Sequence, residues 1–206
     1  MENAIAQIFT LHVPRASRDY CVSLWNTYNF RLKLRNKRIS KVGDFSASPG
    51  TIPLITINRD LHPYLFLITY IHEVAHLVAH EKFGNRIESH GKEWKSLFNQ
   101  LMQPVLLEEI FPSPLLVVLK KHLTNPKAST FSDMALSKIL RHYDSKQKNV
   151  VLLSQLPEGT VFGYNGKWFK RGKMRRTRIV CNELGSRHKY LVPADAAVNH
   201  AQPTLL

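Results

Sequence analysis

The spacing of apolar residues changes along the chain, predicting helices and strands in its first part and short strands in its last. Residues 30–35 alternate apolar and basic side chains, which predicts a strand whose exposed face is Arg31, Lys33 and Arg35. From residue 150 onward five short strand candidates follow, with a two-residue hairpin turn at residues 165–166. Further strands are predicted at residues 38–46 and 51–58, and helices at residues 14–28, from Trp94 to Pro104, in short pieces over 106–123, and after Ser132.

One predicted helix, which begins after Asp60 and ends at Gly84, contains the sequence His-Glu-Val-Ala-His at residues 72–76. Residues four apart lie on one face of a helix, about 6 Å from each other, so His72 and His76 can hold one metal ion from the same side. Glu73 follows the first histidine and is then placed to act as a general base on a water molecule. This pattern is typical of zinc peptidases.

Chance and simple core packing are the two competing explanations of this pattern. A chain with 10 His in 206 residues is expected to contain only about 0.02 such pentapeptides. Two buried histidines beside a buried acid would leave three polar groups without partners, whereas a metal ion satisfies all three at once. We therefore predict one bound Zn²⁺.

A third ligand must come from outside this helical face. His80 lies eight residues after His72, about 12 Å along the helix, which is too far to share an ion whose Zn–N bonds are about 2 Å. The predicted turn at Gly84 lets the chain fold back, and His90 then begins the next helix. Glu93 is the competing third ligand, and its alternative role is to complement the dipole of that helix.

The segments around these histidines resemble the SprT-like family of metallopeptidases, which includes the bacterial SprT proteins and the Spartan proteases that cut proteins crosslinked to DNA. The resemblance rests on His-Glu-Val-Ala-His-Leu at residues 72–77, Phe-Gly at 83–84 and His-Gly-Lys-Glu-Trp-Lys at 90–95, and it extends to near residue 105. It implies that His72, His76 and His90 are the zinc ligands and that Glu73 is the general base.

The expected fold class is α+β: a zincin-like core, with a small antiparallel sheet and the HExxH active-site helix, followed by a small mostly-β C-terminal module. We expect a metallopeptidase domain at residues 1–125, a linker and helix at 126–149, a basic β module at 150–198 and a tail at 199–206. SprT proteins typically carry a C-terminal zinc ribbon built on four cysteines, and this chain has only Cys21 and Cys181. A second, cysteine-bound zinc is therefore excluded.

The charge of the chain predicts an anionic partner. The formal net charge is +14 and the pI is about 10.0, values typical of proteins that bind phosphate backbones. The densest basic stretch is predicted to contact nucleic acid, independently of sequence. Its members are Lys167, Lys170, Arg171, Lys173, Arg175, Arg176 and Arg178. Trp168 and Phe169 lie among them, and the favoured interpretation places both in the core of the module, with stacking on unpaired bases as the alternative.

The cellular location is predicted to be cytoplasmic, with no membrane partner. No apolar run approaches the roughly 20 residues that span a bilayer, and residues 1–13 lack a basic leader with an apolar stretch. Two cysteines 160 positions apart fit a reducing compartment.

The combined prediction is a zinc-dependent metalloendopeptidase acting on protein substrates associated with or crosslinked to DNA. A non-proteolytic nucleic-acid-binding protein with a structural zinc is one alternative, and a zinc peptidase unconnected to DNA is another. Peptidases of this kind commonly bind substrate as an extra strand along the sheet edge beside the active-site helix, but the sequence does not say which strand forms that edge.

Overall fold

The computed structural model describes residues 2–38, 41–144, 151–186 and 188–200, and the chain divides into two compact units. Unit 1 comprises residues 1–144 and unit 2 comprises residues 145–206. Each unit has its own hydrophobic core. Among the described residues, no helix combines the length and apolar character needed to cross a bilayer.

Unit 1 is an α+β fold in which six α-helices accompany a three-stranded sheet, as described over residues 2–144 without 39–40. Residues 2–12 form a helix that the apolar pattern did not predict. The elements in chain order are α1 (Glu2–His12), α2 (Arg18–Tyr28), β1 (Arg31–Arg35), β2 (Gly43–Ser46), β3 (Leu54–Asn58), α3 (Pro63–Phe83), α4 (Lys92–Met102), α5 (Ser113–Leu123) and α6 (Met134–Tyr143).

The sheet of unit 1 has the strand order β1-β3-β2 and is mixed, whereas a purely antiparallel sheet was predicted. The chain passes from β1 to the opposite edge, forms β2, and returns into the centre as β3. Consequently β2 is antiparallel to β3 while β1 is parallel to it. Alternation along a strand specifies its two faces but neither its neighbours nor their direction. The sequence pattern therefore did not show that β1 is parallel to β3. The exposed face of β1 is Arg31, Lys33 and Arg35, as predicted.

The metal-binding pattern lies on α3, the most buried helix of unit 1. Pro63 occupies its first turn, and the ring of His62 caps it by accepting a hydrogen bond from the N–H of Leu65 at 3.4 Å. The cap is therefore His62, two residues after the predicted cap, Asp60. It ends at Gly84, whose φ of 63° is a conformation that favours glycine.

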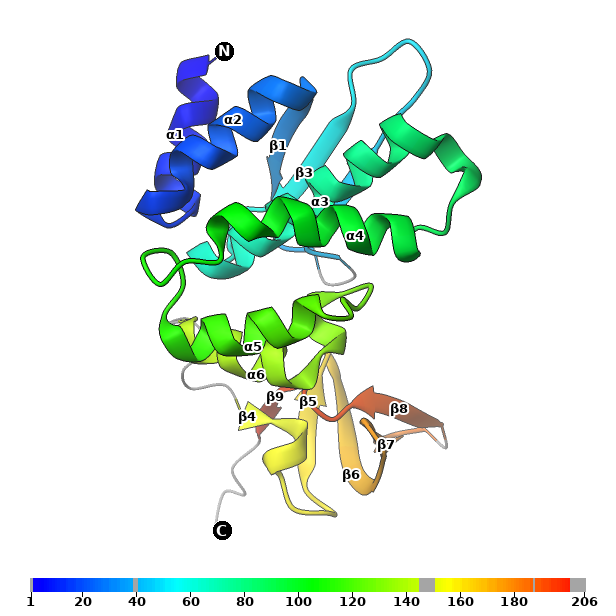
Figure 1. Cartoon of the computed structure of the whole chain (residues 1–206). Helices are drawn as coiled ribbons and strands as arrows, with labels where there is room; N and C mark the ends of the chain where they lie inside the picture. Colours follow the sequence, from blue (N-terminus) through cyan, green and yellow to red (C-terminus); the bar gives the residue numbers. More distant parts are fainter. Residues whose placement is uncertain (1, 39–40, 145–150, 187, 201–206) are drawn as a thin grey trace. The chain divides into compact units, whose positions relative to one another are not determined.

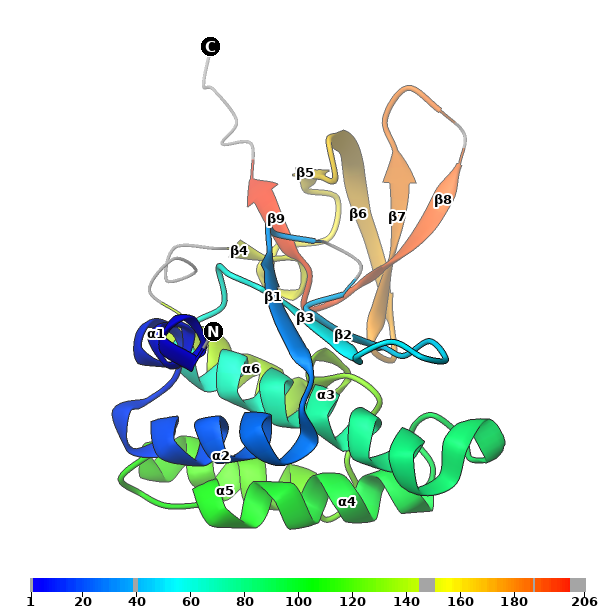
Figure 2. The same ribbon diagram turned by 90° about the horizontal axis from the view of Figure 1, so that it is seen from above.

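Helix α3 lies between the sheet and α4 (Figures 1 and 2). Most residues of α3 before its last turn are buried, and this helix contributes more side chains to the core of unit 1 than any other element. The amphipathic helix predicted after His90 is confirmed as α4. A polar or charged side chain on α3 must therefore be satisfied by a neighbour, by water or by a ligand.

Helices α5 and α6 form a hairpin that packs into the same core. Near one end of the pair, Tyr143 of α6 contacts Tyr64 of α3, with ring centroids 5.4 Å apart. At the other end, the loop after α5 is held to α4, because Lys95 donates a hydrogen bond to Asn125 at 2.8 Å and Asn99 donates to the carbonyl of Leu123 at 3.3 Å. Residues 124–133 thus belong to unit 1 and are anchored at its surface.

Unit 2 is a six-stranded sheet with the order β4-β9-β5-β6-β7-β8, described over residues 151–186 and 188–200. Its strands are β4 (Val151–Leu152), β5 (Val161–Tyr164), β6 (Lys167–Arg175), β7 (Arg178–Glu183), β8 (Lys189–Pro193) and β9 (Ala197–His200). The predicted hairpin turn is confirmed by φ angles of 50° at Asn165 and 77° at Gly166. Strand β9 was not predicted, and it includes residues 199 and 200 of the predicted tail. Residues 201–206 lie outside the described residues.

Candidate metal centre

The structure brings His72, His76 and His90 together at one point. Their Nε2 atoms are 3.2 Å apart for His72 and His76, 3.1 Å for His76 and His90, and 3.3 Å for His90 and His72. In the described part of the chain, these three residues are the one group of metal-ligating side chains close enough to share an ion. Glu93, the alternative third ligand, is exposed on α4 and lies outside this group.

The spacing of the three Nε2 atoms is explained better by a shared metal ion than by hydrogen bonds between the rings. In a tetrahedral zinc site with Zn–N bonds of about 2.05 Å, the ligand nitrogens are about 3.3 Å apart, close to the separations observed here. Hydrogen bonds cannot account for the same triangle. Each neutral Nε2 is either a donor or an acceptor, so at least one of the three contacts always joins two atoms of the same kind. An ion that accepts all three lone pairs removes this conflict.

Burial keeps these imidazoles in the form that binds metals. It lowers the pKa of His72 well below its usual range, and the neighbouring His76 and His90 lower it further. The pKa of His76 falls to about 4 through burial and the proximity of His90. Burial and then Lys95 lower the pKa of His90. All three rings are therefore neutral near pH 7, with lone pairs available to a cation.

Trp94 of α4 fixes the orientation of the three histidine rings. Its ring centroid lies 4.6 Å from that of His72, 5.1 Å from that of His76 and 4.7 Å from that of His90, and the side chain is fully buried. Phe98 stacks on Trp94 at 5.1 Å, and its ring centroid lies 5.5 Å from that of His72. The sequence held a signal for part of this arrangement, since Trp94 and Phe98 are one turn apart on α4, but the pattern alone indicated only core packing. His90 was predicted to begin this helix, whereas it precedes the first helical residue, Lys92.

Glu73 is buried against strand β2, with 7% of the residue exposed. Burial raises the pKa of its carboxyl group to about 8, and Asp44 adds to that rise, while Arg38, Lys41 and the backbone N–H of Phe45 act in the opposite direction. A Cβ atom on Gly43 would overlap Oε1 of Glu73, so the absence of a side chain at Gly43 makes room for the carboxylate. The acid is thus positioned by the sheet as well as by its own helix.

The histidines and Glu73 line a cleft of about 440 Å³, and β2 forms one wall of it. The N–H of Asn58 donates to the carbonyl of Val42 at 2.8 Å, which makes these two residues a hydrogen-bonded pair. Along an antiparallel pair such residues alternate with ones whose peptide groups point away from the partner strand. Given the register, Gly43 and Phe45 are of the second kind, so their peptide groups face the open edge of the sheet. Strand β2 is thus the edge beside the site, which the sequence did not identify.

Residues 128–130, which the sequence pattern assigned to a linker, line the same cleft. They lie in the loop between α5 and α6, which the buried His122 stabilises through a contact of 2.8 Å between its Nδ1 atom and Oδ2 of Asp133. Asp133 also caps α6 by accepting hydrogen bonds from the N–H groups of Ala135 and Leu136, where Ser132 was predicted as the cap. A short polar segment is compatible both with a linker and with a loop that lines a functional site.

The predicted basic cluster lies on the β6–β7 hairpin of unit 2, and most of it is exposed. Exposed members are Lys167, Lys170, Lys173, Arg175, Arg176 and Arg178. Arg171 is half-buried and donates to the backbone carbonyls of Gly172 at 3.1 Å and Leu153 at 3.4 Å. The prediction for the two aromatic residues was correct for Phe169 and wrong for Trp168, which is 49% exposed. Successive strand residues face opposite sides of a sheet, so the core admits only one of them.

Comparison with known proteins places the site in a described family. Residues 28–113 match the model of the SprT-like family. Protein SprT from Pseudomonas putida is 67% identical over 27 residues, which is 13% of this chain and 16% of the relative. Protein SprT from Pseudomonas entomophila and from Pseudomonas fluorescens is 63% identical over the same length. The alignments thus span about one sixth of each relative, and no solved structure matches the chain significantly.

The matched region contains the sheet, α3 and α4, and so includes all three histidines and Glu73. It excludes α6, residues 128–130 and the whole of unit 2. Residues 28–113 of the chain are therefore similar to the SprT-like family.

Proposed function

We propose that the chain is a zinc-dependent metalloendopeptidase whose substrates are proteins associated with or crosslinked to DNA. One observation supports the enzymatic part most strongly: three neutral imidazoles converge at tetrahedral spacing, with Glu73 buried in the same cleft. A purely structural metal site has no use for a carboxylate that costs stability to bury. The resemblance to SprT proteins is consistent with this proposal.

The residues that would hold the ion are His72, His76 and His90. When bound there, zinc supplies a Lewis acid that polarises the scissile carbonyl and lowers the pKa of water. Three protein ligands leave one tetrahedral position open, as catalytic zinc sites require. Trp94 keeps the imidazoles from rotating away from the ion, because its ring contacts all three of them.

The substrate is expected to bind as a strand along the open edge of β2. The peptide groups of Gly43 and the carbonyl of Phe45 are available to a new antiparallel neighbour, whereas the N–H of Phe45 is hydrogen-bonded to Glu73. Main-chain hydrogen bonds can therefore hold an extended peptide with little demand on its sequence. Residues 128–130 line the same cleft and restrict its size. A folded domain would not enter such a cleft, so the preferred substrate is an extended or locally unfolded segment.

Glu73 is the proposed general base and then the general acid. Its carboxylate accepts a proton from the attacking water and later delivers that proton to the leaving amine. The raised pKa of Glu73 reflects an apolar surrounding that makes the ionised carboxylate a stronger base. A bound dication lowers that pKa again, because its positive charge favours the carboxylate.

The DNA part of the proposal rests on charge. The net charge of +14 and the exposed basic residues of unit 2 favour a polyanion, and basic side chains that neutralise phosphates bind DNA without regard to sequence. A strong decrease of affinity with rising salt is the expected signature.

The test uses the zinc-loaded full chain and one protein substrate in two forms, free and covalently crosslinked to a DNA oligonucleotide. We expect faster cleavage of the crosslinked form, and no cleavage by Glu73→Gln at unchanged zinc content. Equal cleavage of both forms would leave a zinc peptidase unconnected to DNA. Absence of cleavage by the wild-type chain, with zinc bound, would favour the non-proteolytic alternative.

A further inference from the structure

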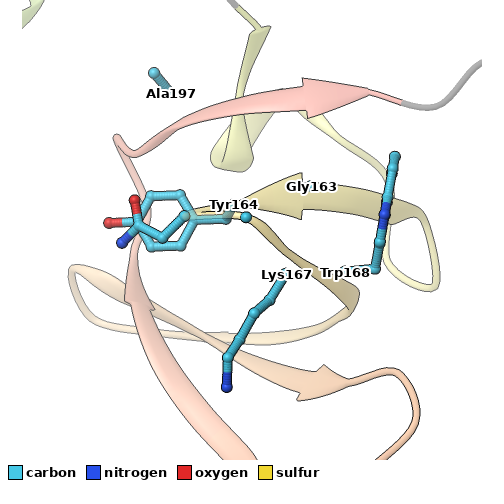
Figure 3. A pocket seen from close by; sticks show the side chains of 7 residues that line it. Gly163, Tyr164, Lys167, Trp168 and Ala197 are labelled. Carbon is cyan, nitrogen blue, oxygen red and sulfur yellow. The ribbon is translucent and has the colours of Figure 1, made fainter.

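The strand register of unit 2 sorts its basic and aromatic side chains onto two faces of the sheet. Phe169 pairs with Phe162, and both are buried, so they mark the inner face. Trp168 pairs with Gly163 and therefore points to the outer face. Figure 3 shows Trp168 and Lys167 leaving β6 in opposite directions.

A hollow of about 210 Å³ lies beside Trp168 on this outer face (Figure 3). Its lining includes Gly163 and Ala197, the small residues of the neighbouring strands, and the hairpin turn at residues 165–166. Because Gly163 has no side chain, nothing from β5 covers the indole ring. The volume corresponds to about seven water molecules at about 30 Å³ each, which is room for one flat ring system but not for a helix.

Basic residues lie on the same face of the sheet as this ring, along β6, β7 and β8. Lys170 pairs with Asn182, which pairs with Lys189, and all three are exposed. Arg175 and Arg178 are also exposed and lie directly opposite each other, an arrangement of like charges that is unfavourable until an anion lies between them.

Acidic side chains are separated from this surface. Within the described strands of unit 2, the acidic residue is Glu183, which pairs with Phe169 and so belongs to the inner face. Its Oε1 atom lies 2.7 Å from Nζ of Lys167, and its Oε2 accepts a hydrogen bond from Tyr190 at 3.1 Å. Lys167 thus has a partner within the protein, on the opposite face from Trp168.

We propose that the outer face of unit 2 binds single-stranded nucleic acid, with a base stacked on Trp168 and the phosphates along the bound strand held by Lys170, Lys189, Arg175 and Arg178. An exposed indole offers a stacking surface to any base, and surrounding cations neutralise the backbone. A duplex keeps its bases stacked on each other, so it cannot place one in the hollow. This inference rests on the nucleic-acid part of the proposed function and uses no residue of the metal centre.

The test is a titration of the zinc-loaded full chain with a fluorescently labelled 12-nucleotide thymidine strand and with a 12-base-pair duplex. We expect tighter binding of the single strand and a quench of indole fluorescence on saturation. Trp168→Ala should weaken single-strand binding about 5- to 100-fold and abolish most of the quench. Trp168→Phe, which keeps an aromatic ring, should restore much of the affinity.

The matched control is a pair of lysine variants. Lys170→Gln on the outer face should weaken binding and reduce the salt dependence, whereas Lys120→Gln, which removes the same charge from an exposed position on α5 of unit 1, should bind within about twofold of wild type. Wild-type affinity in Trp168→Ala, or preference for the duplex, would overturn the inference while leaving general DNA binding intact. If neither DNA bound at low salt, both the single-strand inference and the proposed general DNA binding would be overturned. A loss of cleavage in Glu73→Gln with unchanged titrations separates the peptidase question from this one.

Discussion

Replacement of Glu73 by glutamine should stabilise the metal-free protein, and the gain should grow with pH. The carboxyl group has a pKa of about 8 in the folded chain, against an ordinary value of 4.5, because it is buried. Glutamine occupies nearly the same volume and carries no charge at any pH. The variant therefore removes the cost of burying an ionisable group while keeping the packing against β2.

The direction of the effect follows from proton binding. Below pH 4.5 Glu73 is protonated in both states, so it contributes no difference. Between pH 4.5 and about pH 8 it ionises in the unfolded chain and stays protonated in the folded chain, which lowers the free energy of unfolding as pH rises. The accumulated loss is about 1 kcal/mol at pH 5 and about 3 kcal/mol at pH 7.

The measurement is thermal unfolding of the metal-free protein in a chelator, followed by circular dichroism at 222 nm. All the described α-helices belong to unit 1, so this signal reports the unit that contains Glu73. Relative to wild type, the variant should gain about 2 kcal/mol more at pH 7 than at pH 5, or about 4–8 °C in Tm. The lowered pKa values of the three histidines make both proteins less stable below about pH 6.5, so this contribution cancels in the difference.

Glu93→Gln is the matched control, because it makes the same chemical change at an exposed position one helical turn after His90. Its effect should stay below about 0.5 kcal/mol and vary little with pH. Bound zinc should shrink the stability difference for Glu73→Gln, since a nearby dication lowers the pKa of the carboxyl group. A difference in Tm that is the same at pH 5 and pH 7 would refute the reasoning, because it would mean that Glu73 ionises normally in the folded protein.

Three further predictions concern the metal centre and its cleft. His90→Ala should lower zinc affinity at least about 100-fold in a competition assay with a chelator, whereas His80→Ala should leave it unchanged; equal effects would place the third ligand elsewhere. Gly43→Ala should keep zinc and fold but reduce kcat about 10- to 100-fold, because its Cβ would displace the carboxylate of Glu73; unchanged kcat would show that this position is not needed. Ala128→Trp should obstruct the cleft and lower kcat/KM about tenfold or more at unchanged zinc content, while Val117→Trp, on the exposed face of α5, should not.

The two candidate ligands on α3 could be brought together from the sequence because helical geometry is local. His72 and His76 are one turn apart in any α-helix, and their joint role needs no knowledge of the fold. His90 required more, since its placement depends on the turn at Gly84 and on the packing of α4 against α3. The resemblance to SprT-like proteins supplied what the spacing could not.

Other features of the site depend on contacts between distant segments, which no pattern in the sequence encodes. The position of β2 at the open edge follows from the strand order, and alternation within a strand is silent about order. Residues 128–130 belong to a polar, turn-forming segment of the kind that also forms linkers, so only the packing of the folded chain shows that they line the cleft. The exposure of Trp168, in contrast, could have been predicted from the sequence. Adjacent residues of a strand face opposite sides of the sheet, so Trp168 and Phe169 could not both lie in the core as predicted.

The polar groups around the three imidazoles argue that this part of the core is organised for an ion and not for stability. Besides Glu73, the hydroxyl of Thr69 and the indole N–H of Trp94 are buried without a hydrogen-bond partner in the described structure. Each such group costs on the order of 1–3 kcal/mol, and apolar residues of similar shape would avoid that cost. Several buried polar groups without partners in one place are found in proteins mainly where function requires them. If zinc is what the site is built for, binding should raise the Tm of unit 1 in wild type and leave that of a His72→Ala, His76→Ala double variant unchanged, a comparison that needs no substrate.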